Sequence, residues 1–311
     1  MIAAAMLIAT QQARAGFDLG AAANFSVLGY GTSASNEFGD AVTGPASIIG
    51  NIGVGQDAKL TIGGSGSVVT QQVLYYDPIT STNFIVSPAG TLSINGSTCT
   101  SLATCTANGS IARNQTLLGS ADTAMANLYN SVSQLTATAG SVTQVTGSQT
   151  ISVASNTTYV ANISSLNLGN NMTLTLQGDS TDYFVFNITG NFNGNGTGKI
   201  TLNGVADDHV IFNLLTPANG GKTGSTAQLA NSFIGAGIIL GLASDITDNG
   251  QTVWNGRLFG AGNSDFVKVK GGATVGAPEI DASSGTAAIA FVLGVLALVG
   301  ERRKARTRVP T

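Results

Sequence analysis

Charged side chains are scarce in this chain. Lys, Arg, Asp and Glu make up only 9% of its 311 residues, whereas typical globular domains carry about 25%. Intrinsic disorder is nevertheless excluded, because disordered segments are poor in hydrophobic residues and this chain is 43% hydrophobic. The few basic residues form no patch in the body of the chain, which argues against nucleic-acid binding. The 41 glycines follow no Gly-X-Y period, so collagen is excluded as well.

Residues that carry catalytic chemistry are nearly absent. His209 is the single histidine, and it follows Asp207 and Asp208 at the start of an apolar run. A catalytic triad or a metal site would need further partners around it, so we interpret His209 as a structural residue at a strand end. Glu37 is the only glutamate before Glu279, which leaves no carboxylate pair for glycosidase chemistry. We therefore predict a protein that is not an enzyme and has no catalytic residue, cofactor or metal.

Cysteine is almost as rare. Cys99 and Cys105 are the only two, with five residues between them. Two cysteines so close together in an exported chain favour a small disulfide loop. A redox or metal role would require additional partners.

The start of the chain has the pattern of a targeting segment. Residues 1–15 are predicted to be a signal peptide, because the apolar run Ile2–Ala9 is followed by the small-x-small sequence Ala13-Arg14-Ala15. A basic n-region is missing, so either the true start lies upstream or the signal peptide is a poor one. The alternative is a buried N-terminal helix.

A second apolar run lies near the C-terminus. Ala282–Gly300 contains 19 residues without a charge, and as a helix it would span about 28 Å, close to the bilayer core of about 30 Å. Five basic residues follow: Arg302, Arg303, Lys304, Arg306 and Arg308. The positive-inside rule then predicts a transmembrane helix with a cytoplasmic tail and an exported body. The alternative is a helix buried in the core.

The motif before this run completes a known layout. Pro278, Glu279 and Ile280, then one apolar helix and an Arg-rich end, resemble the PEP-CTERM sorting signal, although Ile280 stands where the commonest motif has a second proline. The resemblance covers residues 278–311. It implies recognition by an exosortase, anchoring in the inner membrane before processing, and a final place at the cell surface or outside the cell. It also implies a bacterium with an envelope rich in exopolysaccharide.

The body, residues 16–277, is predicted to be one mainly β domain. Short runs rich in Val, Ile, Phe and Thr alternate with Asn-Gly turns, which is typical of a β-sandwich or an irregular β-solenoid. In Met172–Leu176 the apolar residues alternate with Thr173 and Thr175. This pattern predicts a strand with one buried face and one solvent-exposed face. Tyr183–Phe186 and Val210–Phe212 are apolar on both faces, so another element must cover them.

One segment has a helical period. From about 114 to 137 the apolar residues recur at steps of three and four: Leu118, Ala121, Met125, Leu128, Val132 and Leu135. Asn114 or Ser120 is a candidate N-cap, and Gly140 lies beyond the end. We predict that this helix is structural and covers the strands that are apolar on both faces.

The order of these segments is similar to that of the ice-binding-protein-like family. The resemblance rests on short motifs in a fixed order around the single helix: Leu19–Gly29, Gly50–Val54, Asp182–Phe186 and Trp254–Phe259. It implies an irregular right-handed β-solenoid with one long α-helix packed alongside. The Gly/Ser/Thr-rich stretch 55–110 departs from the family and is expected to be an insertion or an enlarged cap.

Three functions remain open at this point. The leading hypothesis is a non-enzymatic exported protein of the cell envelope or extracellular matrix. The alternative is an ice-binding adhesin, for which the resemblance implies an outward face of short side chains; the candidates are Ser152, Asn167, Thr173, Thr175 and Thr201. A polysaccharide-binding module is the third, with Trp254 and Tyr183 as candidate contacts. The expected partners are thus an exosortase-type enzyme, the membrane, and exopolysaccharide or ice.

Overall fold

The computed structural model describes residues 17–29, 35–38, 45–62, 66–86, 92–215, 225–242, 244–260 and 266–276. The chain divides into two compact units, Met1–Ala277 and Pro278–Thr311, and all described residues belong to the first. The predicted signal peptide, sorting motif, apolar C-terminal run and basic tail lie outside the described residues. Among the described helices, none is long and apolar enough to cross a membrane.

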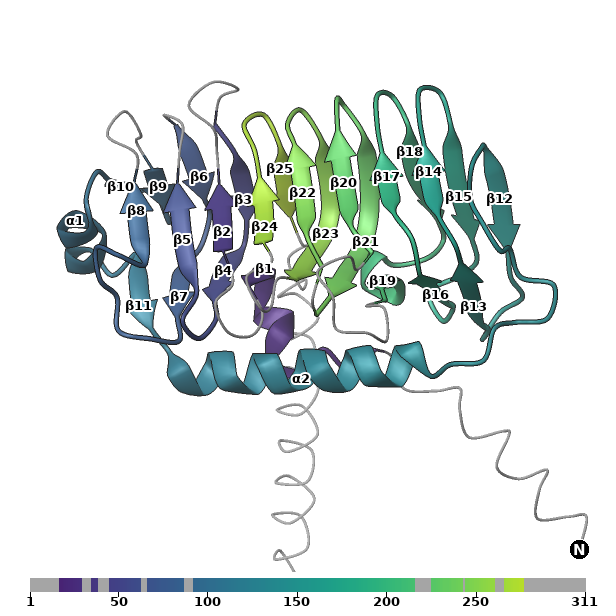
Figure 1. Ribbon diagram of the computed structural model, residues 1–311, viewed down its shortest axis with the longest axis horizontal. Coiled ribbons are helices and arrows are strands. Elements are labelled where there is room, and N and C mark those ends of the chain that lie inside the picture. Colours follow the sequence, from purple (N-terminus) through teal and green to yellow (C-terminus); the bar gives the residue numbers. More distant parts are fainter. Residues whose placement is uncertain are drawn as a thin grey trace, which may run out of the picture. The chain divides into compact units, whose positions relative to one another are not determined.

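The body is mainly β, as predicted, and apart from one antiparallel hairpin at the end of the stack its described strands pair in parallel as successive three-sided coils (Figure 1). The 17-stranded sheet forms two of the three faces, and the open face is the one of these two that does not carry the long helix. In stacking order it consists of β12 (Gln149–Ser152), β15 (Thr173–Gln177), β18 (Lys199–Asn203), the first halves of β21 (Ile234–Gly241) and β23 (Val253–Gly260), β25 (Thr274–Gly276), β3 (Ser47–Ile49), β6 (Ser67–Val69) and β9 (Leu92–Ile94).

The helix face is the side that packs against the long helix. Its strands are β13 (Thr158–Ile163), β16 (Tyr183–Ile188), β19 (Val210–Leu214), the second halves of β21 and β23, β1 (Phe25–Gly29), β4 (Asn51–Val54), β7 (Val73–Tyr75) and β11 (Ile111–Arg113). Gly237 and Gly256 bend β21 and β23 from one face to the other with φ of 117° and 154°. A Cβ on Gly256 would lie 1.9 Å from the carbonyl oxygen of Gly237, so this corner requires glycine.

The third face is a separate sheet of eight strands. These are β14 (Leu166–Leu168), β17 (Phe192–Gly194), β20 (Ala227–Ala230), β22 (Ile246–Asn249), β24 (Phe266–Val269), β2 (Ser35–Phe38), β5 (Lys59–Ile62) and β8 (Phe84–Val86). The predicted insertion 55–110 supplies β5 to β10 and α1, so it builds regular coils and the cap of one end. The handedness of the coils stays a prediction.

The order of the coils in space differs from their order in the sequence. The middle coil combines β25 from the end of the body with β1 and β2 from its start. β1 lies between β23 and β4, and β2 lies between β24 and β5. Strands from the first half of the body therefore continue the stack beyond the last strand of the second half.

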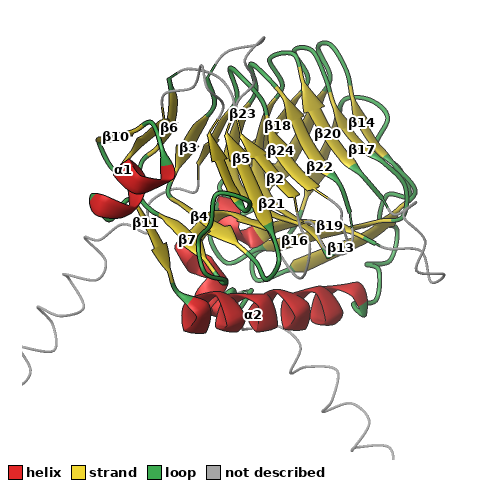
Figure 2. Ribbon diagram, turned by 60° about the vertical axis from the view of Figure 1, so that its left-hand side comes forward, coloured by secondary structure: helices red, strands yellow, loops and turns green. Residues whose placement is uncertain are grey.

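The long helix α2 (Gln115–Ser133) connects the two ends of this stack and lies along the helix face (Figures 1 and 2). Asn114 caps it, as predicted, by accepting a 3.1 Å hydrogen bond from the Leu117 amide. The helix ends at Ser133, earlier than the predicted 137, and beyond it Thr138 bonds to Val160 of β13 through both its amide and its hydroxyl. Five residues of the predicted stripe are buried in the helix: Leu118, Ala121, Met125, Leu128 and Val132. The sixth, Leu135, lies beyond the end of the helix and is only partly buried against the same core.

The stripe covers the strands that are apolar on both sides. Val185 of β16 and Ile211 of β19 pack with it, while Phe186 and Phe212 of the same strands point into the main core. One side of β16 and β19 therefore packs against the helix and the other side packs in the main core. This explains why both strands are apolar on both faces in the sequence.

A ladder of asparagines that the sequence analysis missed fixes the end of α2. Asn162, Asn187 and Asn213 stand in register on adjacent strands, and their side-chain amides are linked at 3.2 and 2.8 Å. Asn187 donates to the carbonyl oxygen of Val132 at 3.0 Å, and Asn213 donates to the Ser133 hydroxyl at 3.0 Å. The ladder thereby ties the last turn of the helix to the sheet, through the Val132 carbonyl and the Ser133 hydroxyl.

We expect Leu128→Asp to destabilise the protein severely. Leu128 is 4% exposed within the helix-face core, so the variant buries an unpaired carboxylate, at a cost of roughly several kcal/mol. Thermal unfolding measures the effect, with Asn127→Asp at an exposed position of the same helix as the control. An unchanged melting temperature for Leu128→Asp would show that this stripe does not hold the helix to the sheet.

Candidate functional site

The open face presents a regular grid of outward side chains. Thr150, Thr175 and Thr201 stand in register on β12, β15 and β18. Their neighbours inside the strands, such as Leu174, are buried. In such a sheet adjacent strands lie about 4.8 Å apart, and alternate residues of one strand about 6.6 Å apart. Three aligned threonines therefore form a short, evenly spaced row.

A second outward row runs beside the first and crosses more of the stack. In register order its members are Thr173, Lys199, Ile234, Val253, Thr274, Ser47, Val68 and Ser93. Only Lys199 in this row carries a charge. From β21 to β9 the row is therefore uncharged, and most of its residues are small or β-branched.

Exposed apolar side chains concentrate on the same face. Among the described residues, the large hydrophobic side chains that are exposed are Ile49, Val68, Ile234 and Val253, between 37% and 48%. All four belong to open-face strands, and Ile49 pairs with Gly276 at the edge of the middle coil. Single exposed hydrophobics are ordinary, but their gathering on one face marks it as an interaction surface.

The structure groups only part of the predicted candidate set. Thr173, Thr175, Thr201 and Ser152 lie on the open face, but Thr173 pairs with Lys199 and Ser152 pairs with Gln177. Asn167 does not share that surface.

Asn167 lies on β14 of the third face, where its side chain accepts a 2.7 Å hydrogen bond from Asn193. The grouping of Asn167 with the threonines was wrong, because the sequence does not show at which corner each coil turns. The analysis also missed Thr150, Ile234 and Val253, although outward alternation in their strands was a usable signal.

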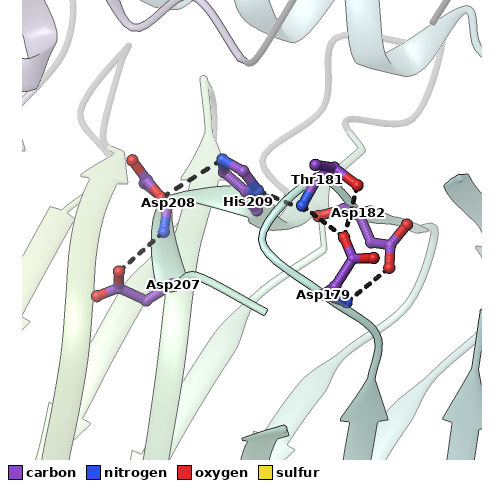
Figure 3. Close-up of polar contacts among 6 residues, drawn as sticks. All are labelled: Asp179, Thr181, Asp182, Asp207, Asp208 and His209. Carbon is purple, nitrogen blue, oxygen red and sulfur yellow. Dashed lines mark hydrogen bonds and ion pairs between the residues drawn. The ribbon is translucent and has the colours of Figure 1, made fainter. Parts of the chain in front are cut away.

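His209 lies at a corner between two coils, beside Asp182 and Asp208 (Figure 3). Its Nδ1 lies 3.1 Å from the carbonyl oxygen of Asp182, and its Nε2 lies 3.9 Å from Asp208 Oδ1. The ring stacks on Tyr183 with centroids 4.0 Å apart, and Phe17 packs edge-on against Tyr183 at 5.0 Å. These contacts tie the start of the body to the corner.

The neighbouring aspartates stabilise the turn before β16 (Figure 3). Asp179 accepts hydrogen bonds from the amide and hydroxyl of Thr181, and the hydroxyl bonds of Thr181 and Ser155 lower the pKa of Asp179. Asp182 accepts from the Thr157 amide at 2.8 Å and from the Asp179 amide at 2.7 Å. Both carboxylates are thus engaged by the turn.

The aromatic candidates do not form a sugar-binding surface. Trp254 is fully buried, and its indole nitrogen donates to the carbonyl oxygen of Gly237 at 3.0 Å. Tyr183 is held between His209 and Phe17. The suggestion that Trp254 contacts a polysaccharide was therefore wrong, because the ring fills the core beneath the corner of β21 and β23.

The two cysteines are free and buried. Burial is the main cause of the raised pKa of Cys105, and a side-chain hydrogen bond with Cys99, in which the Cys105 thiol donates, adds to it. The structure brings the predicted pair together without a bond between the sulfur atoms, so the disulfide stays a prediction.

Comparison with known proteins identifies the C-terminal segment. Residues 277–307 match the VPEID-CTERM protein sorting domain. The letters VPEID in the name of this domain correspond to residues 277–281, where Ile280 and Asp281 fit and Ala277 replaces the valine. The sequence analysis did not use Asp281. The three-part sorting signal predicted from residue 278 onward is thereby confirmed as a sorting domain, which supports export. No curated protein sequence matches the chain significantly.

Solved structures with a similar fold are ice-binding proteins. The DUF3494 domain of ice-binding protein 1 from Shewanella frigidimarina has a TM-score of 0.50 and 15% identity, over 86% of this chain and all of that domain. An ice-binding protein from an Antarctic biological consortium scores 0.49 at 20% identity, covering 86% and 94% of the two chains. A glycosylated ice-binding protein from an Arctic yeast scores 0.49 at 17%, covering 86% and 97%. At this identity the Shewanella likeness establishes the fold alone.

Proposed function

We propose that this protein is an exported, non-enzymatic surface protein that binds ice through its open face. The main observation in its support is that Thr150, Thr175 and Thr201 stand in register. Beside them runs an almost uncharged row of short and β-branched side chains. The ice-binding proteins of similar fold support the choice of ligand, and the sorting domain supports export. In this proposal the body is a right-handed β-solenoid, anchored by its C-terminal helix until an exosortase-type enzyme processes it.

The chemistry of the face suits a rigid, extended, uncharged ligand. β-Branched side chains on a sheet have few rotamers, so contact costs them little conformational entropy. Threonine offers a hydroxyl and a methyl group side by side, which combines hydrogen bonding with apolar contact. A charged face would have to lose more water on contact, and Lys199 is the only charge in the two rows.

Ice growth at fixed supercooling tests the ligand. We expect the wild type to slow crystal growth and Thr175→Tyr/Thr201→Tyr to lose the effect, because two large rings disrupt the aligned row without entering the core. The matched control is Gln228→Tyr/Thr247→Tyr, a pair in register on the third face. If the wild-type protein has no effect on crystal growth, ice is excluded as the ligand and adhesion to the extracellular matrix is left as the function. Equal activity in both double variants would place the ice contact on another face.

Cell fractionation tests the anchor. We expect truncation after Ala277 to release a folded body from the membrane fraction, because the apolar run Ala282–Gly300 is removed. The comparison variant is Pro278→Ala/Glu279→Ala in the full chain, which keeps the run but alters the motif; it should stay in the membrane unprocessed. A truncated chain that remained with the membrane would contradict the proposed anchor.

A further inference from the structure

The end of the stack opposite β12 is closed by a small cap. The hairpin of β9 and β10 (Ser97–Cys99) is followed by the short helix α1 (Leu102–Ala107), which begins with a capping box between Ser101 and Thr104. Figure 1 shows α1 at the extreme end, beside β10 and β11. The cap therefore covers strands that have no further coil to pair with.

The two cysteines join the two parts of this cap. Cys99 is the last residue of β10, and Cys105 lies in α1. Both side chains are 0% exposed and belong to the main core together with Tyr75 and Ile111. α1 packs against β10, so the two cysteines lie on neighbouring elements of the cap.

We infer that Cys99 and Cys105 form a disulfide in the exported protein, that the bond forms before α1 packs onto the stack, and that it then holds the cap closed. The order follows from burial, because an oxidant cannot reach thiols that are fully covered. A thiolate is also the attacking species, and burial raises the pKa of Cys105 to about 12, so the folded thiols react little.

The oxidant is a protein disulfide of the thiol–disulfide exchange class, as found in oxidising export compartments. One cysteine, as thiolate, attacks that disulfide and forms a mixed disulfide, releasing one partner thiolate. The second cysteine, also deprotonated, attacks the mixed disulfide, forms the Cys99–Cys105 bond and releases the second partner thiolate. The chain loses two electrons and two protons, and the partner disulfide is reduced to a dithiol.

A closed cap matters because strand edges at the end of a stack invite pairing with other chains. Without the bond, α1 is held only by its packing and its capping box. Local opening of such small elements occurs well below the free energy of global unfolding. The crosslink limits this opening by tying α1 to β10.

The test uses the full chain, expressed with export and purified without reductant. After denaturation, alkylation should label neither cysteine, and both should react once reductant is added. We expect the reduced, folded wild type to be cleaved within residues 95–110 faster than the oxidised form, on the order of tenfold. Its melting temperature should be lower by roughly a few degrees. Cys99→Ser and Cys105→Ser should each behave like the reduced form.

The comparison of oxidised with reduced wild type needs no substitution, so it decides the matter even if a serine variant does not fold. Two alkylated thiols in the exported, unreduced protein would overturn the disulfide. A disulfide whose reduction changes neither cleavage nor melting would overturn its role in holding the cap.

Discussion

Arg257→Met is expected to lower the stability of the body by about 2–3 kcal/mol, the usual cost of losing a buried hydrogen bond made by a charged group. Arg257 is 6% exposed, and its guanidinium donates to the carbonyl oxygen of Phe25 in β1 at 2.9 Å. Burial lowers the pKa of Arg257, whereas the charges of Asp207 and Asp208 raise it. The substitution therefore removes a hydrogen bond to the first strand and the positive charge that attracts Asp207 and Asp208.

Thermal unfolding measures this effect, with a fall of roughly 5–10 °C expected for a body of this size. Arg257→Met/Asp207→Asn should recover part of the loss, because the second change removes the carboxylate that the guanidinium charge stabilises. In the wild type, burial and the charge of Asp208 raise the pKa of Asp207, and the charge of Arg257 lowers it. Full additivity of the two changes would show that the pair does not interact.

Asp248→Asn is expected to stabilise the protein at pH 8 by roughly 2–4 kcal/mol and to lose this advantage by pH 4. Asp248 is fully buried on β22, its Oδ1 accepts from the Thr252 hydroxyl, and its Oδ2 has no hydrogen-bond partner among the described residues. Burial raises the pKa of Asp248 to about 7, against smaller lowering effects of the Thr252 hydroxyl and the Gly250 amide.

The direction follows from proton binding. Between about pH 4 and pH 7 the folded protein keeps the Asp248 proton that the unfolded chain has already released, so this group makes stability fall as pH rises. The stabilisation is complete below the unfolded pKa and is lost as pH passes the folded value of about 7. The difference in unfolding free energy between variant and wild type, measured from pH 4 to pH 8, isolates this group from the other carboxylates. A difference independent of pH would mean that Asp248 does not titrate in this range.

The features that could be predicted from the sequence are those that depend on residues close together along the chain. The stripe from Leu118 to Val132 and the alternation around Thr173 and Thr175 are local patterns, and both describe the folded protein correctly. Register between coils depends on where each turn ends, and turn lengths vary in this chain. The alignment of Thr173 with Lys199 and the place of Asn167 on the third face could therefore not be predicted.

Contacts between residues far apart in the sequence could not be predicted either. The asparagine ladder involves positions separated by 25 and 26 residues, and Asn187 reaches a helix 55 residues earlier. Asparagine in a strand ordinarily indicates a turn nearby. Nothing local distinguishes Asn187 from the asparagines of the exposed turns, so its role as a helix partner appears only when the strands are stacked.

The composite middle coil ties the fold to the order of synthesis. β1 is made first but pairs with β23, and the coil lacks its open-face strand until Gly276 has been added. Contacts between residues so far apart in the sequence form slowly. β1 therefore remains without its partner β23 until nearly the whole body has been synthesised. The sorting domain begins at residue 277, directly after that last strand. A chain that stops before β25 therefore lacks both this strand and the sorting domain. Every chain that carries the sorting domain contains all the strands of the body.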